Sequence, residues 1–150
     1  MKFDSVEKVL EYAIAKEEDA YRFYTDLAGR TSRPHMRALF EGFAKEEQGH
    51  KQKLIRVREG QIAMPSAEKV RDLKIGDNLV EVELNADMEL QDALIVAMKA
   101  EKAAFKLYTD LAEAAGDTVT RDLFQSLAQE EARHKLRFEI EYDNYVYKEN

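Results

Sequence analysis

The residues of this chain that could do chemistry are four glutamates and two histidines in a repeated arrangement. Two Glu-x-x-His pairs occur, and another glutamate stands 30 residues before the glutamate of each pair. On a helix, residues three apart share a face, so each pair can present a carboxylate and an imidazole to one ligand. Iron and manganese favour such a ligand set, and zinc also accepts it. The six candidate metal ligands are Glu17, Glu47, His50, Glu101, Glu131 and His134.

These residues recur because the sequence is duplicated at an offset of 84 residues. The run Tyr24–Ala28 is repeated at Tyr108–Ala112 without a gap, and residues 9–55 contain 17 identities in 47 positions at this offset. A duplicated unit that packs against its copy places equivalent residues about a pseudo-two-fold axis. The duplication therefore predicts that the candidate ligands converge on one site.

Apolar residues recurring at three and four positions predict four long helices. Asp4 or Ser5 can cap the first helix, Ser32 with Pro34 can begin the second, and Asp87 can cap the third. The expected helices span about residues 5–29, 34–59, 88–115 and 118–147.

Residues 60–87 interrupt the helical pattern and predict one long connection. Short turns join the first two helices and the last two, so each pair is expected to form an antiparallel hairpin, whereas the connection must cross the length of the bundle. The expected fold is all-α, a four-helix bundle of two duplicated hairpins joined by one long crossover. We expect residues 1–150 to form a single domain.

Each candidate ligand interrupts an apolar helix face. Glu17 and Glu101, for example, stand in the middle of the apolar stripes of their helices. Burying an unpaired carboxylate costs several kcal/mol, and four together would repel one another. Two divalent ions would balance the four negative charges, so we expect two iron ions per chain, with manganese or zinc as alternative metals.

Other polar residues near this pattern have a simpler explanation. Glu18 points about 100° away from the ligand face and is expected in solvent. Glu46 and Glu130 lie beside the glutamates of the pairs, and we expect them to face outward, the alternative being that they support the ligands from outside. The repeat equivalent of His35 is Val119, and Ser32 stands three residues before it, so His35 is expected to be a surface histidine.

The composition narrows the classes of function. The chain has no cysteine, which rules out disulfides, thiolate metal sites and a cysteine nucleophile within it. A net charge of −7 disfavours nucleic acid and anionic membranes as partners. No targeting signal and no long apolar run is present, so a cytoplasmic protein is expected.

The doubled Glu-x-x-His with its two preceding glutamates resembles the ferritin-like di-iron carboxylate proteins, and among them the di-iron domain of rubrerythrin. This resemblance covers all four expected helices. It implies that the six candidates are iron ligands and that Glu47 and Glu131 bridge the two ions. Tyr24 and Tyr108, seven residues after the helix-centre glutamates, match tyrosines that flank such sites. They are either core aromatics with a hydrogen-bonded hydroxyl, or catalytic candidates that take part in redox chemistry or support the ligands.

The chain departs from rubrerythrins in two respects. It lacks the cysteines of the rubredoxin domain that delivers electrons in that family, so electrons are expected from an external donor protein. Rubrerythrins also carry a further glutamate one turn before the third-helix ligand, where this chain has Met98, with Ile14 at the equivalent position of the first repeat.

The resemblance implies a non-haem di-iron oxidoreductase that reduces hydrogen peroxide or dioxygen. The alternatives are a ferroxidase that handles iron as its substrate, and a structural metal-binding bundle without turnover. We expect a homodimer or another small homo-oligomer. Exchange of hairpins between chains is an option, because duplicated halves can pair between two chains as they pair within one.

Overall fold

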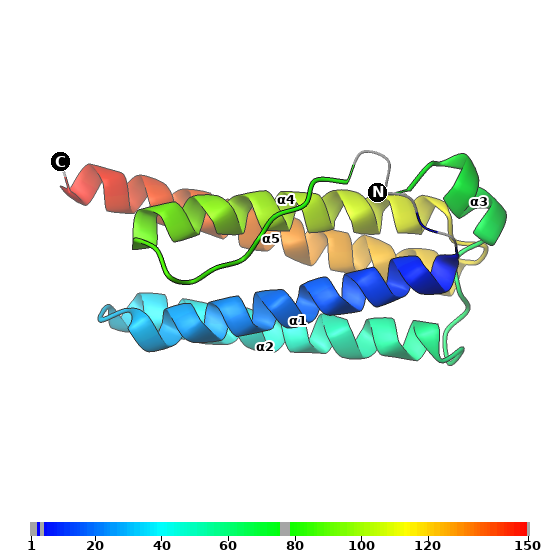
Figure 1. Ribbon diagram of the computed structural model, residues 1–150, viewed down its shortest axis with the longest axis horizontal. Coiled ribbons are helices and arrows are strands. Elements are labelled where there is room, and N and C mark those ends of the chain that lie inside the picture. Colours follow the sequence, from blue (N-terminus) through cyan, green and yellow to red (C-terminus); the bar gives the residue numbers. More distant parts are fainter. Residues whose placement is uncertain (1–2, 4, 76–78, 150) are drawn as a thin grey trace.

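The protein is a bundle of four long helices with one short helix in the crossover (Figure 1). The computed structural model describes residues 3, 5–75 and 79–149, and none of these forms a strand. The all-α prediction is therefore confirmed. The helices are α1 (Val6–Arg30), α2 (Pro34–Arg58), α3 (Ala67–Asp72), α4 (Leu90–Glu113) and α5 (Thr118–Glu149).

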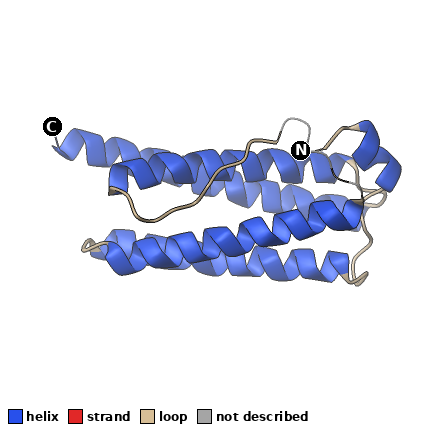
Figure 2. Cartoon of the chain, viewed as in Figure 1, coloured by secondary structure: helices blue, strands red, loops and turns tan. Residues whose placement is uncertain are grey.

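The long helices form two hairpins. Short turns let α1 pack along α2 and α4 pack along α5, and the two hairpins lie against each other in the bundle (Figure 1). Between them, the chain leaves the end of α2, forms α3 at one end of the bundle, and returns across α4 and α1 as an irregular segment (Figure 2). The single long crossover is therefore confirmed, although its short helix α3 was not predicted.

Two of the three predicted helix caps differ from those in the structure. The Ser5 side chain accepts a hydrogen bond from the backbone N–H of Lys8 and caps α1, as one of the two expected residues; the other, Asp4, lies outside the described residues. The other two expected caps were wrong. Pro34 is the first residue of α2, so the capping position falls on Arg33 rather than Ser32. The third long helix starts after Glu89, two residues beyond Asp87.

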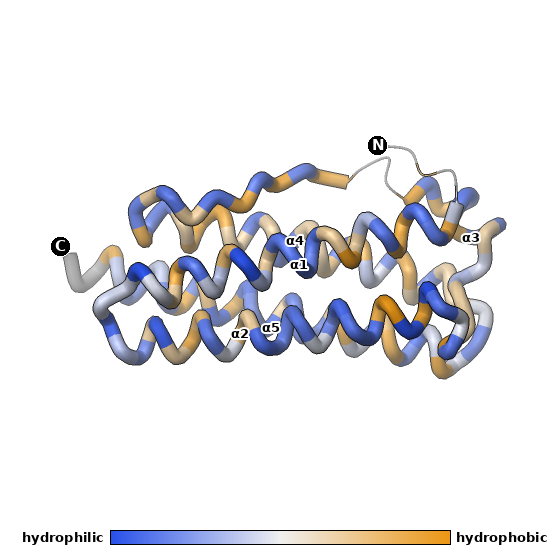
Figure 3. Tube along the Cα trace, turned by 60° about the horizontal axis from the view of Figure 1, so that its bottom comes forward, coloured by the Kyte–Doolittle hydropathy of each residue, from blue (hydrophilic) through white to orange (hydrophobic). Residues whose placement is uncertain are grey.

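The core divides into two apolar clusters, one toward each end of the bundle. On α1, residues 6–13 belong to the first cluster and residues 20–28 to the second, and Glu17 lies between them. The candidate ligands of α2, α4 and α5 likewise fall between the residues that their helix gives to the two clusters. Figure 3 shows polar and apolar residues alternating along each long helix, as in amphipathic helices. The fold therefore holds a polar layer midway along an otherwise apolar core.

No described helix combines the length and the apolar composition needed to cross a lipid bilayer.

Candidate metal centre

The polar layer in the middle of the bundle contains all six candidate ligands. One long helix contributes Glu17, another Glu101, and the remaining two contribute the Glu-x-x-His pairs. All six side chains are buried, with no more than 2% of any residue exposed. The structure thus brings together every residue that the duplication predicted to converge.

The six side chains form two overlapping groups of four that could each hold a metal ion. In each group, one atom from every residue lies within 4.8 Å of the corresponding atoms of the other three. Glu47 and Glu131 belong to both groups. The first group adds Glu17 and His50, and the second adds Glu101 and His134. Two ions held this way would share the carboxylates of Glu47 and Glu131, the arrangement expected for bridging ligands.

Both histidines direct the Nδ1 atom of the ring toward the carboxylates. Nδ1 of His50 lies 2.6 Å from Oε1 of Glu131, and Nδ1 of His134 lies 3.3 Å from Oε1 of Glu47. The rings are nearly parallel, with centroids 6.2 Å apart. One histidine therefore serves each group, on the side of the layer formed by α2 and α5.

The opposite ring nitrogens contact two glutamates that the sequence analysis placed outside the site. Nε2 of His134 donates a hydrogen bond to Oε2 of Glu46 at 2.9 Å, and Nε2 of His50 donates to Oε2 of Glu130. The expectation that Glu46 and Glu130 simply face outward was wrong. Each is about one-third exposed, yet its carboxylate reaches inward to a buried histidine.

These two contacts determine what the histidines can bind. A carboxylate that accepts from Nε2 fixes a proton on that nitrogen, so Nδ1, which faces the neighbouring carboxylates, is the nitrogen left to bind a metal ion. Glu46 comes from α2 and serves the histidine of α5, while Glu130 comes from α5 and serves the histidine of α2. Their recurrence at equivalent positions of the repeat was the signal in the sequence that could have identified them.

Two tyrosines support the remaining glutamates in the same reciprocal way. The Tyr24 hydroxyl of α1 donates to Glu101 of α4, and the Tyr108 hydroxyl of α4 donates to Glu17 of α1. Each tyrosine is buried in one of the two apolar clusters. Burial, and then the negative charge of the glutamate, raises the pKa of each hydroxyl well above its usual value. Both hydroxyls therefore stay protonated near neutral pH and act as donors.

The electrostatics of this layer favour a bound cation. Burial, and then the neighbouring carboxylates, raise the pKa of Glu47 and Glu131 well above the usual range. Burial opposes the charged form of His134, but the carboxylates of Glu101 and Glu47 outweigh it and raise its pKa to about 11. In the absence of a cation, Glu47 and Glu131 hold protons, which reduces the repulsion among the carboxylates of the layer.

Hydrogen bonding shows that the donor set fits a metal pair. Each of the six side chains has one buried oxygen or nitrogen that finds no hydrogen-bond partner among the described residues. Buried polar atoms without partners are rare in folded proteins, and each costs about 1–3 kcal/mol. The unpartnered atoms include the Nδ1 atom of both histidines, whose other nitrogen is already bonded. They are the atoms that a pair of oxygen- and imidazole-binding metal ions would use.

The remaining candidates lie outside the layer, as expected. Glu18 is partly exposed and pairs with Arg22 and Lys51. His35 is exposed, and its Nε2 lies 3.1 Å from Oε2 of Glu141.

The family is identified by its sequence pattern. The family model described as Rubrerythrin matches residues 8–142, which include α2 and α4 completely and most of α1 and α5. This chain belongs to the rubrerythrin family. The six residues of the polar layer all lie within the matched segment. No curated protein matches the sequence.

Solved structures of two other proteins share the fold. A hypothetical protein from Pyrococcus furiosus superposes with a TM-score of 0.75 at 24% identity, over 96% of this chain and 92% of that protein. A Thermotoga maritima protein described as a ferritin-like diiron-carboxylate protein gives a TM-score of 0.74 at 18% identity, over 92% of this chain and 94% of that one. The fold is therefore the ferritin-like one that the sequence resemblance implied.

The two positions that depart from the rubrerythrin pattern carry apolar side chains in the structure as well. Met98 packs against the apolar cluster that contains Tyr24, and Ile14 packs against the cluster that contains Tyr108. Neither position adds a carboxylate to the polar layer. The candidate ligands in the layer are therefore the same six residues.

Proposed function

We propose that this chain is a di-iron oxidoreductase that reduces hydrogen peroxide, or dioxygen, with electrons from a separate donor protein. The observation that carries the proposal is the pair of four-residue groups that share Glu47 and Glu131. With two ferrous ions bound, the centre would supply the two electrons that convert hydrogen peroxide and two protons into two water molecules. Membership of the rubrerythrin family supports this chemistry.

The chain's own residues would hold, orient and isolate that centre. Glu17 and His50 would complete one metal site, and Glu101 and His134 the other, around the shared carboxylates. Glu46 and Glu130 hold a proton on Nε2 of each histidine, so that Nδ1 would be the nitrogen that binds the metal ion.

Two tyrosine hydroxyls and the two apolar clusters surround the polar layer, and they would orient its carboxylates and exclude water. The Tyr24 hydroxyl donates to one oxygen of Glu101, and the Tyr108 hydroxyl donates to one oxygen of Glu17. The second oxygen of each carboxylate has no hydrogen-bond partner among the described residues and would be free to bind a metal ion. The two apolar clusters close the layer from both ends of the bundle. A charge held between them is poorly solvated, which strengthens its interaction with the fixed carboxylates.

The donor and the assembly are part of the same proposal. The sequence has no cysteine, so a rubredoxin-type iron site does not occur within these 150 residues, and a separate protein would supply the electrons. We further propose a homodimer or another small homo-oligomer. Light scattering during size exclusion measures this directly, and a shell of about two dozen subunits would favour iron storage instead.

The test is the oxidation rate of the reduced, iron-loaded protein. Mixing it anaerobically with hydrogen peroxide in a stopped-flow spectrometer is expected to oxidise it faster than mixing with air-saturated buffer. Glu131→Ala should abolish this oxidation, whereas the exposed Glu83→Ala should retain it. A preference for dioxygen would favour the ferroxidase alternative, and an inert centre would favour a structural metal site.

A further inference from the structure

A small pocket lies beside the polar layer, between α1 and α4. Its volume is about 50 Å³, and its floor is formed by the four glutamates of the layer. The walls are mostly methyl groups, from Ala13 and Ala20 on α1 and from Ala100, Ala103 and Ala104 on α4. Leu79, Val80, Val82 and Leu84 of the crossover form its roof. The pocket therefore connects the crossover segment with the carboxylates.

This pocket marks the accessible side of the polar layer. Neither His50 nor His134 lines it, because both rings lie on the side formed by α2 and α5. The four glutamates on its floor are at least 98% buried and each has an oxygen without a hydrogen-bond partner among the described residues. A small molecule in the pocket would thus meet the carboxylates directly, with no imidazole in between.

The size of the pocket limits what it can hold. An apolar cavity of roughly 150 Å³ accommodates benzene, and a single water needs at least about 10–15 Å³. At about 50 Å³, the pocket has room for a molecule of two heavy atoms and is too small for an aromatic ring. Hydrogen peroxide and dioxygen meet this limit, whereas aryl hydroperoxides exceed it.

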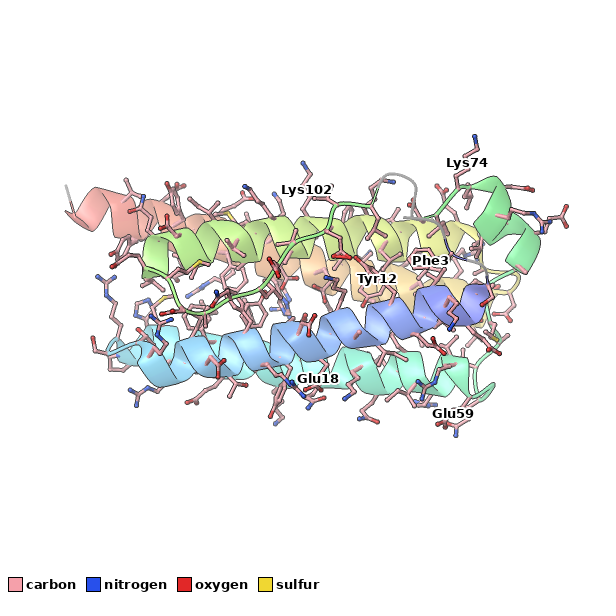
Figure 4. The ribbon with its side chains drawn as sticks, in the orientation of Figure 1. Phe3, Tyr12, Glu18, Glu59, Lys74 and Lys102 are labelled. Atoms are coloured by element: carbon pink, nitrogen blue, oxygen red, sulfur yellow. The ribbon has the colours of Figure 1, made fainter. Side chains whose placement is uncertain are left out.

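Leu79 and Leu84 of the roof pack against the two apolar clusters, and Glu81 adds a polar attachment to α1. Oε2 of Glu81 lies 2.7 Å from Nζ of Lys16, and the Tyr12 hydroxyl also hydrogen-bonds to Glu81. Lys16 and Tyr12 are one turn apart on α1, with the ammonium 5.5 Å from the ring centroid. Figure 4 shows Tyr12 pointing from α1 toward the crossover and α4. Glu81 therefore fastens the crossover to the helix that carries Glu17.

This attachment is weak enough to open. The Lys16 and Glu81 side chains are 32% and 52% exposed, and exposed ion pairs stabilise a structure only slightly. The attachment also breaks the symmetry of the duplication. The repeat equivalents of Tyr12 and Lys16 are Val96 and Ala100, which offer no hydrogen bond to the crossover.

We propose that residues 79–84 form a size-selecting cover over the metal centre and that Glu81 is the positioning residue that keeps it closed. The closed pocket admits hydrogen peroxide or dioxygen and excludes bulky hydroperoxides. This inference rests on the proposed function for the identity of the oxidant, but the cover and its attachment are testable without any redox reaction.

The first experiment uses xenon as an apolar probe of the full chain loaded with redox-inert zinc. Xenon-129 NMR is expected to show a bound signal that Ala100→Leu removes by filling the pocket, while Lys99→Leu, at the neighbouring exposed position, leaves it in place. Glu81→Gln should speed xenon exchange about threefold, as expected for loss of an exposed ion pair. Glu83→Gln removes the same charge from the same segment and should not change the exchange.

The second experiment compares two oxidants on the iron-loaded, reduced chain. The ratio of the oxidation rate with hydrogen peroxide to that with cumene hydroperoxide should fall about threefold in Glu81→Gln and stay constant in Glu83→Gln. If Glu81→Gln matches Glu83→Gln in both xenon exchange and this ratio, the cover is refuted. If xenon exchange responds as expected but neither hydroperoxide oxidises the centre, the proposed function fails and the cover stands.

Discussion

The two sides of the polar layer differ in how they are built. On the α2 and α5 side, the duplication is nearly symmetric: each histidine donates to a glutamate of the other helix, Glu130 or Glu46. On the α1 and α4 side, alanines leave a pocket, and the ion pair to the crossover segment above it comes from Lys16 of α1. The layer therefore has one side on which α2 and α5 hold the two histidines, and another on which α1, α4 and the crossover enclose a pocket.

This difference shows how a duplicated bundle can separate two tasks. Fixing ligands requires that both halves keep the same contacts, because each half supplies the partners of the other. Admitting a small molecule requires a gap at one place only, so the outward positions of α1 and α4 are free to diverge. Lys16 is the equivalent of Ala100, and Asp19 is the equivalent of Ala103.

The largest effect on metal binding is expected from Glu131, which lies where the two sides of the layer meet. Glu131→Ala removes a carboxylate that belongs to both ligand groups, so metal content should fall from about two ions per chain to nearly none. Elemental analysis of protein from iron-supplemented cells measures this. Glu139→Ala, on the exposed part of the same helix, is the matched control. Full metal content in the Glu131 variant would refute the ligand assignment.

Removal of the metal should destabilise the protein more at neutral pH than in mild acid. The pKa values of Glu47 and Glu131 are raised in the folded state, so their protons stabilise the folded chain below the usual glutamate range. That stabilisation is lost as the pH rises toward the folded-state pKa values, at about 1.4 kcal/mol for each group and pH unit. Bound cations replace the protons and remove this loss.

The measurement is the difference in melting temperature with and without a chelator. At pH 7.5 we expect roughly 10 °C, which corresponds to about 4 kcal/mol of binding free energy for a chain of this size. At pH 5 the difference should be less than half as large. A difference that is equal at both pH values would show that the carboxylates do not hold protons in the metal-free chain.

The smallest effect tests the α2 and α5 side alone. Glu130→Gln weakens the acceptor that fixes the proton on Nε2 of His50, so metal affinity should fall about tenfold without unfolding the bundle. Glu46→Gln should act equally on the other site. Glu18→Gln is the control. Glu18 is also next to a candidate ligand, but its carboxylate pairs with Arg22 and Lys51 and not with a histidine. Competition with a chromophoric chelator gives the affinities. Equal affinities in all three variants would show that Glu46 and Glu130 do not tune the histidines.

The sequence by itself determined the helices, the hairpin order and the six residues of the polar layer. Apolar periodicity is a local property, and a duplication states which residues are equivalent, so Glu17, Glu47, His50 and their copies could be found without coordinates. The capping positions Arg33 and Glu89 were missed because a difference of one or two residues at a helix end changes little in the pattern.

Only the tertiary structure decided which residues surround that layer. Glu46 is rotated about 100° from Glu47 around the axis of α2, and this rotation by itself predicts an outward side chain. It reaches His134, 88 residues away, because α2 and α5 pass close to each other in the bundle. The cover has the same origin, since the contact of Glu81 with Lys16 depends on the path of an irregular segment. Helix periodicity determines the face of the helix on which a residue lies. The packing of the helices and the crossover determines which residues that face contacts.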